Sequence, residues 1–166
     1  MEITAIDIHV HLCDELTLKS KGDRPKQMAR YFGRERKPVS FDEMADQYRE
    51  RKMMAVIQNT TDQTITGLTP VPNDHIAAGV KKNSDVFLGF GVIDPWQGKV
   101  ALEEIKRIKD LGLVGIGEIN PARQQFFPND TRFYPLWEEV QKLGMPILFH
   151  GGMAAAGAGT PRGLGH

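Results

Sequence analysis

Two histidines separated by one residue end a short run of β-branched residues near the start of the chain, Ile6–His11. Such a run predicts a strand, and side chains two positions apart on a strand project from the same face. The imidazoles of His9 and His11 would then point to one side, where neutral imidazole is a common ligand for a divalent metal. The alternative is an ordinary Ile/Val strand that carries two histidines by chance, because a His-x-His spacing alone is common.

Polar residues also stand at the ends of later apolar runs. His150 directly follows the run 146–149, and Glu118 lies near the end of the run 113–119. Three neutral imidazoles and a carboxylate would make a suitable Zn²⁺ or Mn²⁺ site, with water at the open position. For His150, the alternative is a hydrogen-bonded histidine in the core.

Apolar runs that predict strands alternate with amphipathic segments that predict helices. Strands are expected to start near residues 3, 55, 86, 113 and 146, and the joints 110–113 and 142–145 both place a glycine after the last helical turn. Five parallel strands suit either half of a β/α barrel or a doubly wound sheet. No G-x-G-x-x-G or P-loop pattern follows any of these runs, which disfavours the nucleotide-binding folds.

The stretch 14–38 is polar and rich in Lys, Arg and Asp. Ser40 and Glu43 follow it with the spacing of a capping box, which predicts the start of a helix. Because a helix comes directly after it, we interpret residues 14–38 as an insertion over the mouth of a barrel rather than as a linker. A further helix is expected to be capped by Asn73 and Asp74.

The composition is that of a soluble globular protein. The 166 residues include 21 basic and 21 acidic side chains, so nothing electrostatic indicates nucleic acid or an anionic membrane as a partner. No signal peptide is recognised, and no apolar run approaches the ~18 residues of a membrane span. The single cysteine, Cys13, excludes an internal disulfide and fits a reducing cytoplasm. It is either a soft metal ligand or reactive thiol, or a small buried residue.

Three motifs together resemble one family. Residues 6–11, the strand end 115–121 with 127–130 beyond it, and residues 148–152 are similar to the amidohydrolase superfamily. The resemblance is to the branch that contains aminocarboxymuconate-semialdehyde decarboxylase and the resorcylate decarboxylases. Within it, the chain most resembles proteins described as 4-hydroxyphenyl-β-ketoacyl-CoA hydrolases. The fold implied is α/β, a TIM-type barrel.

This resemblance implies that His9, His11 and His150 bind a divalent metal, zinc first and manganese second. Many members have lysine where this chain has Glu118, whereas TatD-type deoxyribonucleases of the superfamily have a metal-binding glutamate in a Gly-Glu-Ile strand end. We therefore predict that Glu118 is a metal ligand, or a catalytic acid or base. The alternative is an ion pair between Glu118 and Arg123 or another base.

Arg123 belongs to the loop after the predicted fourth strand. A guanidinium there would hold a substrate carboxylate or phosphate through two hydrogen bonds, and a solvated surface arginine is the alternative. Asp94, directly before a proline, either binds substrate or, as is commoner, starts a turn. His75 is expected to be exposed, and the terminal His166 has no surroundings that would make it a ligand.

The resemblance also implies an incomplete barrel of about five β/α units, because a complete one has eight strands. Residues 1–166 would be the N-terminal part of a metal-dependent hydrolase barrel. The histidine on the family's sixth strand and the aspartate on its eighth have no counterpart here, so we expect the chain alone to be weakly active or inactive. An open sheet would have two unpaired edges, and we expect a homo-oligomer.

Three functions stay open at this point. The favoured one is a metal-dependent hydrolase in which metal-activated water attacks a carbonyl, with a β-ketoacyl C–C bond as a candidate target. The first alternative is a metal-dependent decarboxylase, a lyase that releases CO₂. The second is a non-catalytic remnant that needs a partner. The expected substrate is a small molecule, a carboxylate or an acyl-CoA, and the expected location is the cytoplasm.

Overall fold

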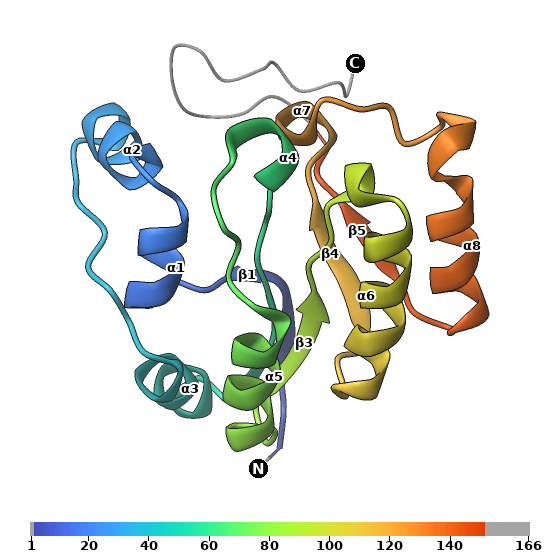
Figure 1. Cartoon of the computed structure of the whole chain (residues 1–166). Coiled ribbons are helices and arrows are strands. Elements are labelled where there is room, and N and C mark those ends of the chain that lie inside the picture. The colour runs from blue at the N-terminus through green and yellow to red at the C-terminus, as the bar shows by residue number, and fades with distance from the viewer. Residues whose placement is uncertain (1, 152–166) are drawn as a thin grey trace.

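Five parallel strands form one sheet in the order in which they occur in the chain. The computed structural model describes residues 2–151 (Figure 1), and the strands are β1 (Ala5–His11), β2 (Met53–Gln58), β3 (Phe87–Gly91), β4 (Gly115–Ile119) and β5 (Ile147–Phe149). A doubly wound sheet reverses its strand order at a switch point, whereas a β/α barrel adds each new strand beside the last. The observed order is that of a barrel, so the chain forms an incomplete TIM-type barrel, as predicted.

Helices connect consecutive strands and pack on one face of the sheet (Figure 1). The longer ones are α3 (Phe41–Glu50), α5 (Asn73–Lys82), α6 (Lys99–Asp110) and α8 (Tyr134–Lys142). Short elements lie in the loops, and α4 and α7 are found where β2 and β4 end. These are α4 (Gln63–Thr66), η1 (Pro95–Gln97), α7 (Pro121–Gln124) and η2 (Thr131–Phe133). No helix in residues 2–151 is both long and apolar enough to cross a membrane.

The core lies between the sheet and these helices. Phe87 on β3, Ile116 on β4 and Ile105 on α6 are fully buried there. The chain approaches itself closely at Gly91 of β3, where an added Cβ would be 2.4 Å from the Ile108 side chain of α6. A glycine in this buried strand therefore lets the helix lie directly on the sheet.

The predicted signals at the helix ends are largely confirmed. The Ser40 Oγ accepts from the Glu43 N–H at 3.2 Å and the Glu43 carboxylate accepts from the Ser40 N–H at 2.9 Å, so the capping box is present. Gly112 and Gly144 both have a positive φ, +82° and +65°, after the last helical turn. The predicted cap at Asn73 is wrong.

Asn73 is the first residue of α5 instead of its cap, which is Pro72. The Asn73 side chain is buried and directed toward Val92. It accepts from the Val92 N–H at 2.8 Å and donates to the Val92 carbonyl at 3.0 Å. The amide therefore satisfies the backbone beyond the end of β3, a use that a local cap pattern does not indicate.

Residues 14–38 contain two helices, α1 (Glu15–Ser20) and α2 (Arg24–Phe32), which stand apart from the helices that cover the sheet (Figure 1). The segment leaves and rejoins the barrel at one point, because the Val39 N–H donates to the Cys13 carbonyl at 2.9 Å. Cys13 is partly buried there. The two helices are therefore held next to the end of β1.

Candidate metal centre

The imidazoles at the end of β1 project from one face of the strand, as the spacing predicts. The Nε2 atoms of His9 and His11 are 3.1 Å apart. Val10, between the two histidines, packs against the core that lies under the helices, so the histidines face the other side of the sheet, the interior of the half-barrel. The pairing of β1 with β2 shifts register between Asp7 and Val10, and Asp7 accepts a hydrogen bond from the Tyr48 hydroxyl of α3. Ile6 and Ile8, 54% and 63% exposed, therefore lie on the side of the strand that the helices do not cover.

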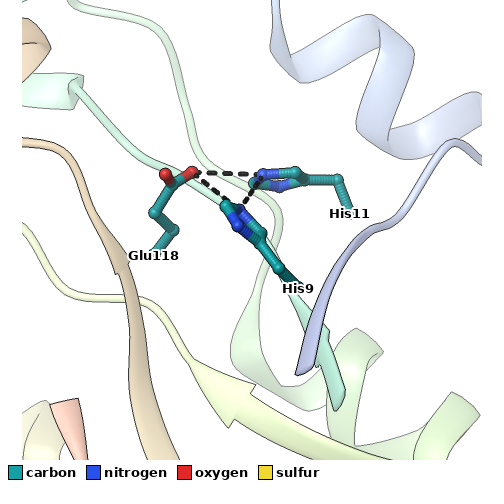
Figure 2. A group of neighbouring side chains, drawn as sticks. All are labelled: His9, His11 and Glu118. Atoms are coloured by element: carbon teal, nitrogen blue, oxygen red, sulfur yellow. Dashed lines mark hydrogen bonds and ion pairs between the residues drawn. The ribbon is translucent and has the colours of Figure 1, made fainter. Parts of the chain in front are cut away.

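Glu118 of β4 points toward both histidines (Figure 2). Its side chain is buried, and one carboxylate oxygen is 3.1 Å from His11 Nε2 and 3.6 Å from His9 Nε2. Its other oxygen is 2.5 Å from His150 Nδ1. Burial acts to raise the pKa of Glu118, but hydrogen bonds and charge from His11 and His150 outweigh it and lower the pKa to about 2. The carboxylate is therefore ionised at neutral pH.

The three side chains present a donor set that a divalent metal fits. The two Nε2 atoms and a Glu118 oxygen all lie within 4.8 Å of one another. Two ligands at the ~2.1 Å bond length of zinc, arranged tetrahedrally, are about 3.4 Å apart, close to the separations observed. Burial is the main cause that lowers the pKa of His11, and it favours the neutral imidazole that a metal needs.

His150 is placed differently from the other two histidines. It lies just after β5, and its Nδ1 contacts Glu118 rather than joining the three-atom group. The buried Nε2 of His150 and Nδ1 of His11 have no hydrogen-bond partner among the described residues. Buried polar atoms are normally paired, so the orphaned Nε2 of His150, whose other nitrogen contacts Glu118, indicates that the site can take a further group.

A cavity of about 420 Å³ adjoins these side chains. One part of its wall comes from residues 14–38, with Lys21, Arg24 and Arg36, and another from α7, with Arg123. The three cations of the 14–38 segment are functional candidates that the sequence analysis missed. Their only signal was the high Lys and Arg content of this stretch, which a solvated surface explains equally well.

Arg123 is 9% exposed, so the alternative of a solvated surface arginine is wrong. Its guanidinium donates to the Thr60 hydroxyl at 2.9 Å and to the Asp62 carboxylate, both in the loop after β2. The alternative of an ion pair between Glu118 and Arg123 is therefore also not observed. Arg123 is held beside the cavity, and within residues 2–151 its guanidinium donates only to Thr60 and Asp62, so part of its donor set has no partner there.

The remaining polar candidates have structural partners. Asp94 accepts from the backbone N–H groups of Trp96 at 3.1 Å and Thr64 at 2.8 Å, which is the turn-forming role. The prediction that His75 is exposed is wrong, because it is half-buried and its Nε2 lies 2.5 Å from the Asp14 carboxylate. His166 lies outside the described residues.

Known proteins give an independent comparison. A family model described as Amidohydrolase matches residues 6–163. Over 79 residues the chain is 34% identical to 2-amino-3-carboxymuconate-6-semialdehyde decarboxylase of Dictyostelium discoideum, a match covering 47% of this chain and 22% of the relative. Over 84 residues it is 30% identical to gamma-resorcylate decarboxylase of a Polaromonas strain, covering 47% and 26%.

A solved structure has the same fold. It is a dihydroxybenzoic acid decarboxylase from Polaromonas with bound manganese and the inhibitor 2-nitroresorcinol, with a TM-score of 0.59 and 21% identity over 93% of this chain and 51% of that one. The matched half of this chain thus covers about a quarter of the length of the two curated relatives, and the chain covers about half of this structure.

Proposed function

Because the chain belongs to the amidohydrolase family, we propose that it carries the metal-binding part of a metal-dependent decarboxylase, a lyase that releases CO₂ from a small carboxylate substrate. The observation that carries this proposal is the group formed by His9, His11 and Glu118 beside a cavity with cationic walls. Both curated relatives described above are decarboxylases. They favour the lyase over the hydrolase that the sequence motifs favoured.

His9 and His11 would hold the metal through their Nε2 atoms, and Glu118 through a carboxylate oxygen. A divalent ion bound there supplies Lewis acidity to a coordinated substrate oxygen. Manganese is bound in the related Polaromonas enzyme, and the nitrogen and oxygen donors of this chain suit manganese or zinc. The predicted role of His150 as a further ligand stays a prediction, and its buried Nε2, which has no hydrogen-bond partner among the described residues, supports it.

Glu118 would act here as a ligand and as the group that orients His150. Its carboxylate contacts imidazoles through both oxygens, so it fixes the rings of His11 and His150 at the same time. A group that orients ligands in this way commonly tunes a metal site. The predicted role of Glu118 as a catalytic acid or base is not needed for this function.

Arg123 would bind the carboxylate of the substrate. Its guanidinium lies in the cavity wall and is fixed by Asp62 and Thr60, so its direction is set before substrate arrives. Preorganised cations of this kind lower the cost of binding an anion. The homo-oligomer, the cytoplasmic location and the absence of nucleic-acid partners stay predictions.

The proposal is tested first by elemental analysis of the purified chain beside a His9→Ala/His11→Ala variant. We expect about one manganese or zinc ion per chain in the wild type and none in the variant. His75→Ala is the matched control, because His75 is a histidine outside the group, and it should keep the metal. Absence of metal from the wild type after dialysis against both ions would overturn the proposal.

The reaction type is tested with γ-resorcylate as a probe, followed by CO₂ release and by product analysis. We expect slow, metal-dependent release of CO₂ that the His9→Ala/His11→Ala variant lacks. The rate should be low, because the chain spans about half of the related structure. Metal-dependent cleavage of a β-ketoacyl thioester without any CO₂ release from γ-resorcylate would favour the hydrolase instead.

A further inference from the structure

Three cationic side chains from the 14–38 segment line the same cavity as the metal group. Lys21 follows the last residue of α1, Arg24 is the first residue of α2, and Arg36 lies in the loop beyond it. Because Cys13 and Val39 tie the two ends of this segment together, the three cations are brought to the cavity as one unit.

These cations have no acidic counterpart in the cavity. Among the described residues that line it, Glu118 is the only carboxylate, and its side chain is engaged by histidines. None of Lys21, Arg24 and Arg36 forms an ion pair within residues 2–151, whereas Arg123 is neutralised by Asp62. The cavity therefore holds an excess of positive charge.

The excess charge is reflected in the titration of Lys21. Burial, the largest cause, and the positive charges of Arg123, Arg24 and Arg36 together lower its pKa to about 8. Burial and Arg123 likewise lower the pKa of Arg24, and they outweigh the opposite effect of the Asp62 and Glu118 carboxylates. Like charges placed together in a partly dry cavity repel one another, and an anion bound among them would remove that repulsion.

The rest of the cavity wall indicates what kind of molecule would carry such an anionic group. Leu12, Leu18, Pro25 and Met28 supply an apolar surface in the same cavity as the cations and the metal group. Ligand cavities with a mostly apolar lining and a few charged groups bind molecules with an apolar body and fixed polar ends.

We propose that Lys21, Arg24 and Arg36 form a second oxyanion subsite, which selects substrates carrying two anionic groups on one apolar body. The proposal rests on the proposed function in one respect, since the first anionic group is the carboxylate bound beside the metal by Arg123. The second group is a carboxylate or a phosphate, both of which offer several oxygen acceptors to clustered cations.

The experiment measures the binding of small probe anions by isothermal titration calorimetry. Benzoate carries one carboxylate and isophthalate carries two on the same ring, so their ratio of affinities isolates the second anionic group. We expect the wild-type chain to bind isophthalate about tenfold more tightly than benzoate. We expect Lys21→Met/Arg24→Gln to bind the two alike. A ratio near one in the wild type, or a ratio unchanged in the variant, would overturn the proposal.

Two further variants control for the loss of charge itself and for a failure of the double variant to fold. Lys19→Met/Arg30→Gln removes the same charges from exposed positions of α1 and α2 outside the cavity lining, and it should keep the wild-type ratio. Arg36→Gln changes an exposed side chain and leaves both helices intact, so it reports on the subsite if the double variant does not fold. We expect it to weaken isophthalate binding several-fold and to leave benzoate binding unchanged. An unchanged isophthalate affinity would count against the subsite.

Separate measurements identify the second anionic group and test the proposed function. Binding of 3-phosphonobenzoate is compared with that of isophthalate, and the tighter of the two assigns a phosphate or a carboxylate to the subsite. CO₂ release and metal content are measured on the same samples. A preference for two anionic groups without metal or turnover would overturn only the proposed function, and turnover without that preference would overturn only the subsite.

Discussion

At the scale of single residues, Glu118 shows which groups a buried carboxylate contacts. Its carboxylate lies among His9, His11 and His150, whereas Arg123, the nearest cation by sequence, pairs with Asp62. A buried carboxylate needs partners that satisfy both of its oxygens. Imidazoles on β1 and just after β5 meet that need, because they face the same interior as β4.

Replacement of Lys21 by methionine is expected to change how stability depends on pH. The pKa of Lys21 falls from 10.5 to about 8 in the folded chain, mainly through burial. Between these values the unfolded chain binds more protons at this residue than the folded chain, so the folded state gains stability as pH rises through that window. Urea unfolding between pH about 8 and 10.5 should show this gain in the wild type and not in Lys21→Met.

The control for this measurement is Lys19→Met, which removes an exposed lysine from the same helix. It should follow the wild-type dependence on pH. The arginines that act on Lys21, namely Arg24, Arg36 and Arg123, and also Cys13, remain in both chains, so their own effects cancel in the comparison. Parallel curves for Lys21→Met and the wild type would show that Lys21 titrates normally.

At the scale of elements, the glycines of β3 allow the layer that contains α6 to pack close to the sheet. The sequence of β3, FLGFG, places glycines where Leu113 and Ile108 approach the strand. A side chain at either position would push the covering layer away from the sheet. The distance between the strand and its helix therefore depends on residues that carry no side chain at all.

Gly91→Ala is expected to destabilise the chain by about 1–3 kcal/mol, the usual cost of overpacking a tight core. An added Cβ would lie 2.4 Å from the Ile108 side chain, which has to move. Gly151→Ala serves as the control, because no atom of residues 2–151 lies within 4 Å of a Cβ built there. The free energy of unfolding in urea measures both. A stability equal to that of the wild type in Gly91→Ala would show that α6 adjusts freely.

At the scale of the whole molecule, the half-barrel has two strands with a single neighbour. Among the described residues β1 pairs only with β2, and β5 pairs only with β4. Ile6 and Ile8 of β1 are largely exposed. Exposed apolar side chains at an unpaired sheet edge favour association between molecules.

Ile6→Lys/Ile8→Lys is therefore expected to reduce self-association of the isolated chain. Light scattering over a concentration series should show a smaller rise in mean mass for the variant than for the wild type. Val100→Lys is the control, since Val100 is similarly exposed but lies on α6, away from this edge. If the control reduces association as much as the double variant, the added charge alone accounts for the effect. Ile6 and Ile8 would then not form a surface through which the molecules associate.

Much of the fold was predictable because its signals are local. Alternating β-branched residues, the capping box at Ser40 and the glycines after two helices each depend on neighbours in sequence. The choice between a barrel and a doubly wound sheet was not local. It depends on which strands become neighbours, so the apolar runs left it open, the resemblance implied a barrel, and the order β1 to β5 confirmed it.

The sequence by itself determined that His9 and His11 share one face of a strand, because alternation along a strand is a property of the backbone. Only the tertiary structure decided that Glu118 joins them, that His150 contacts Glu118, and that Arg123 pairs with Asp62. It also brought the cations of the 14–38 segment into the same cavity. The physical reason is that contacts between distant segments depend on strand order, register and packing, which no short stretch of sequence contains.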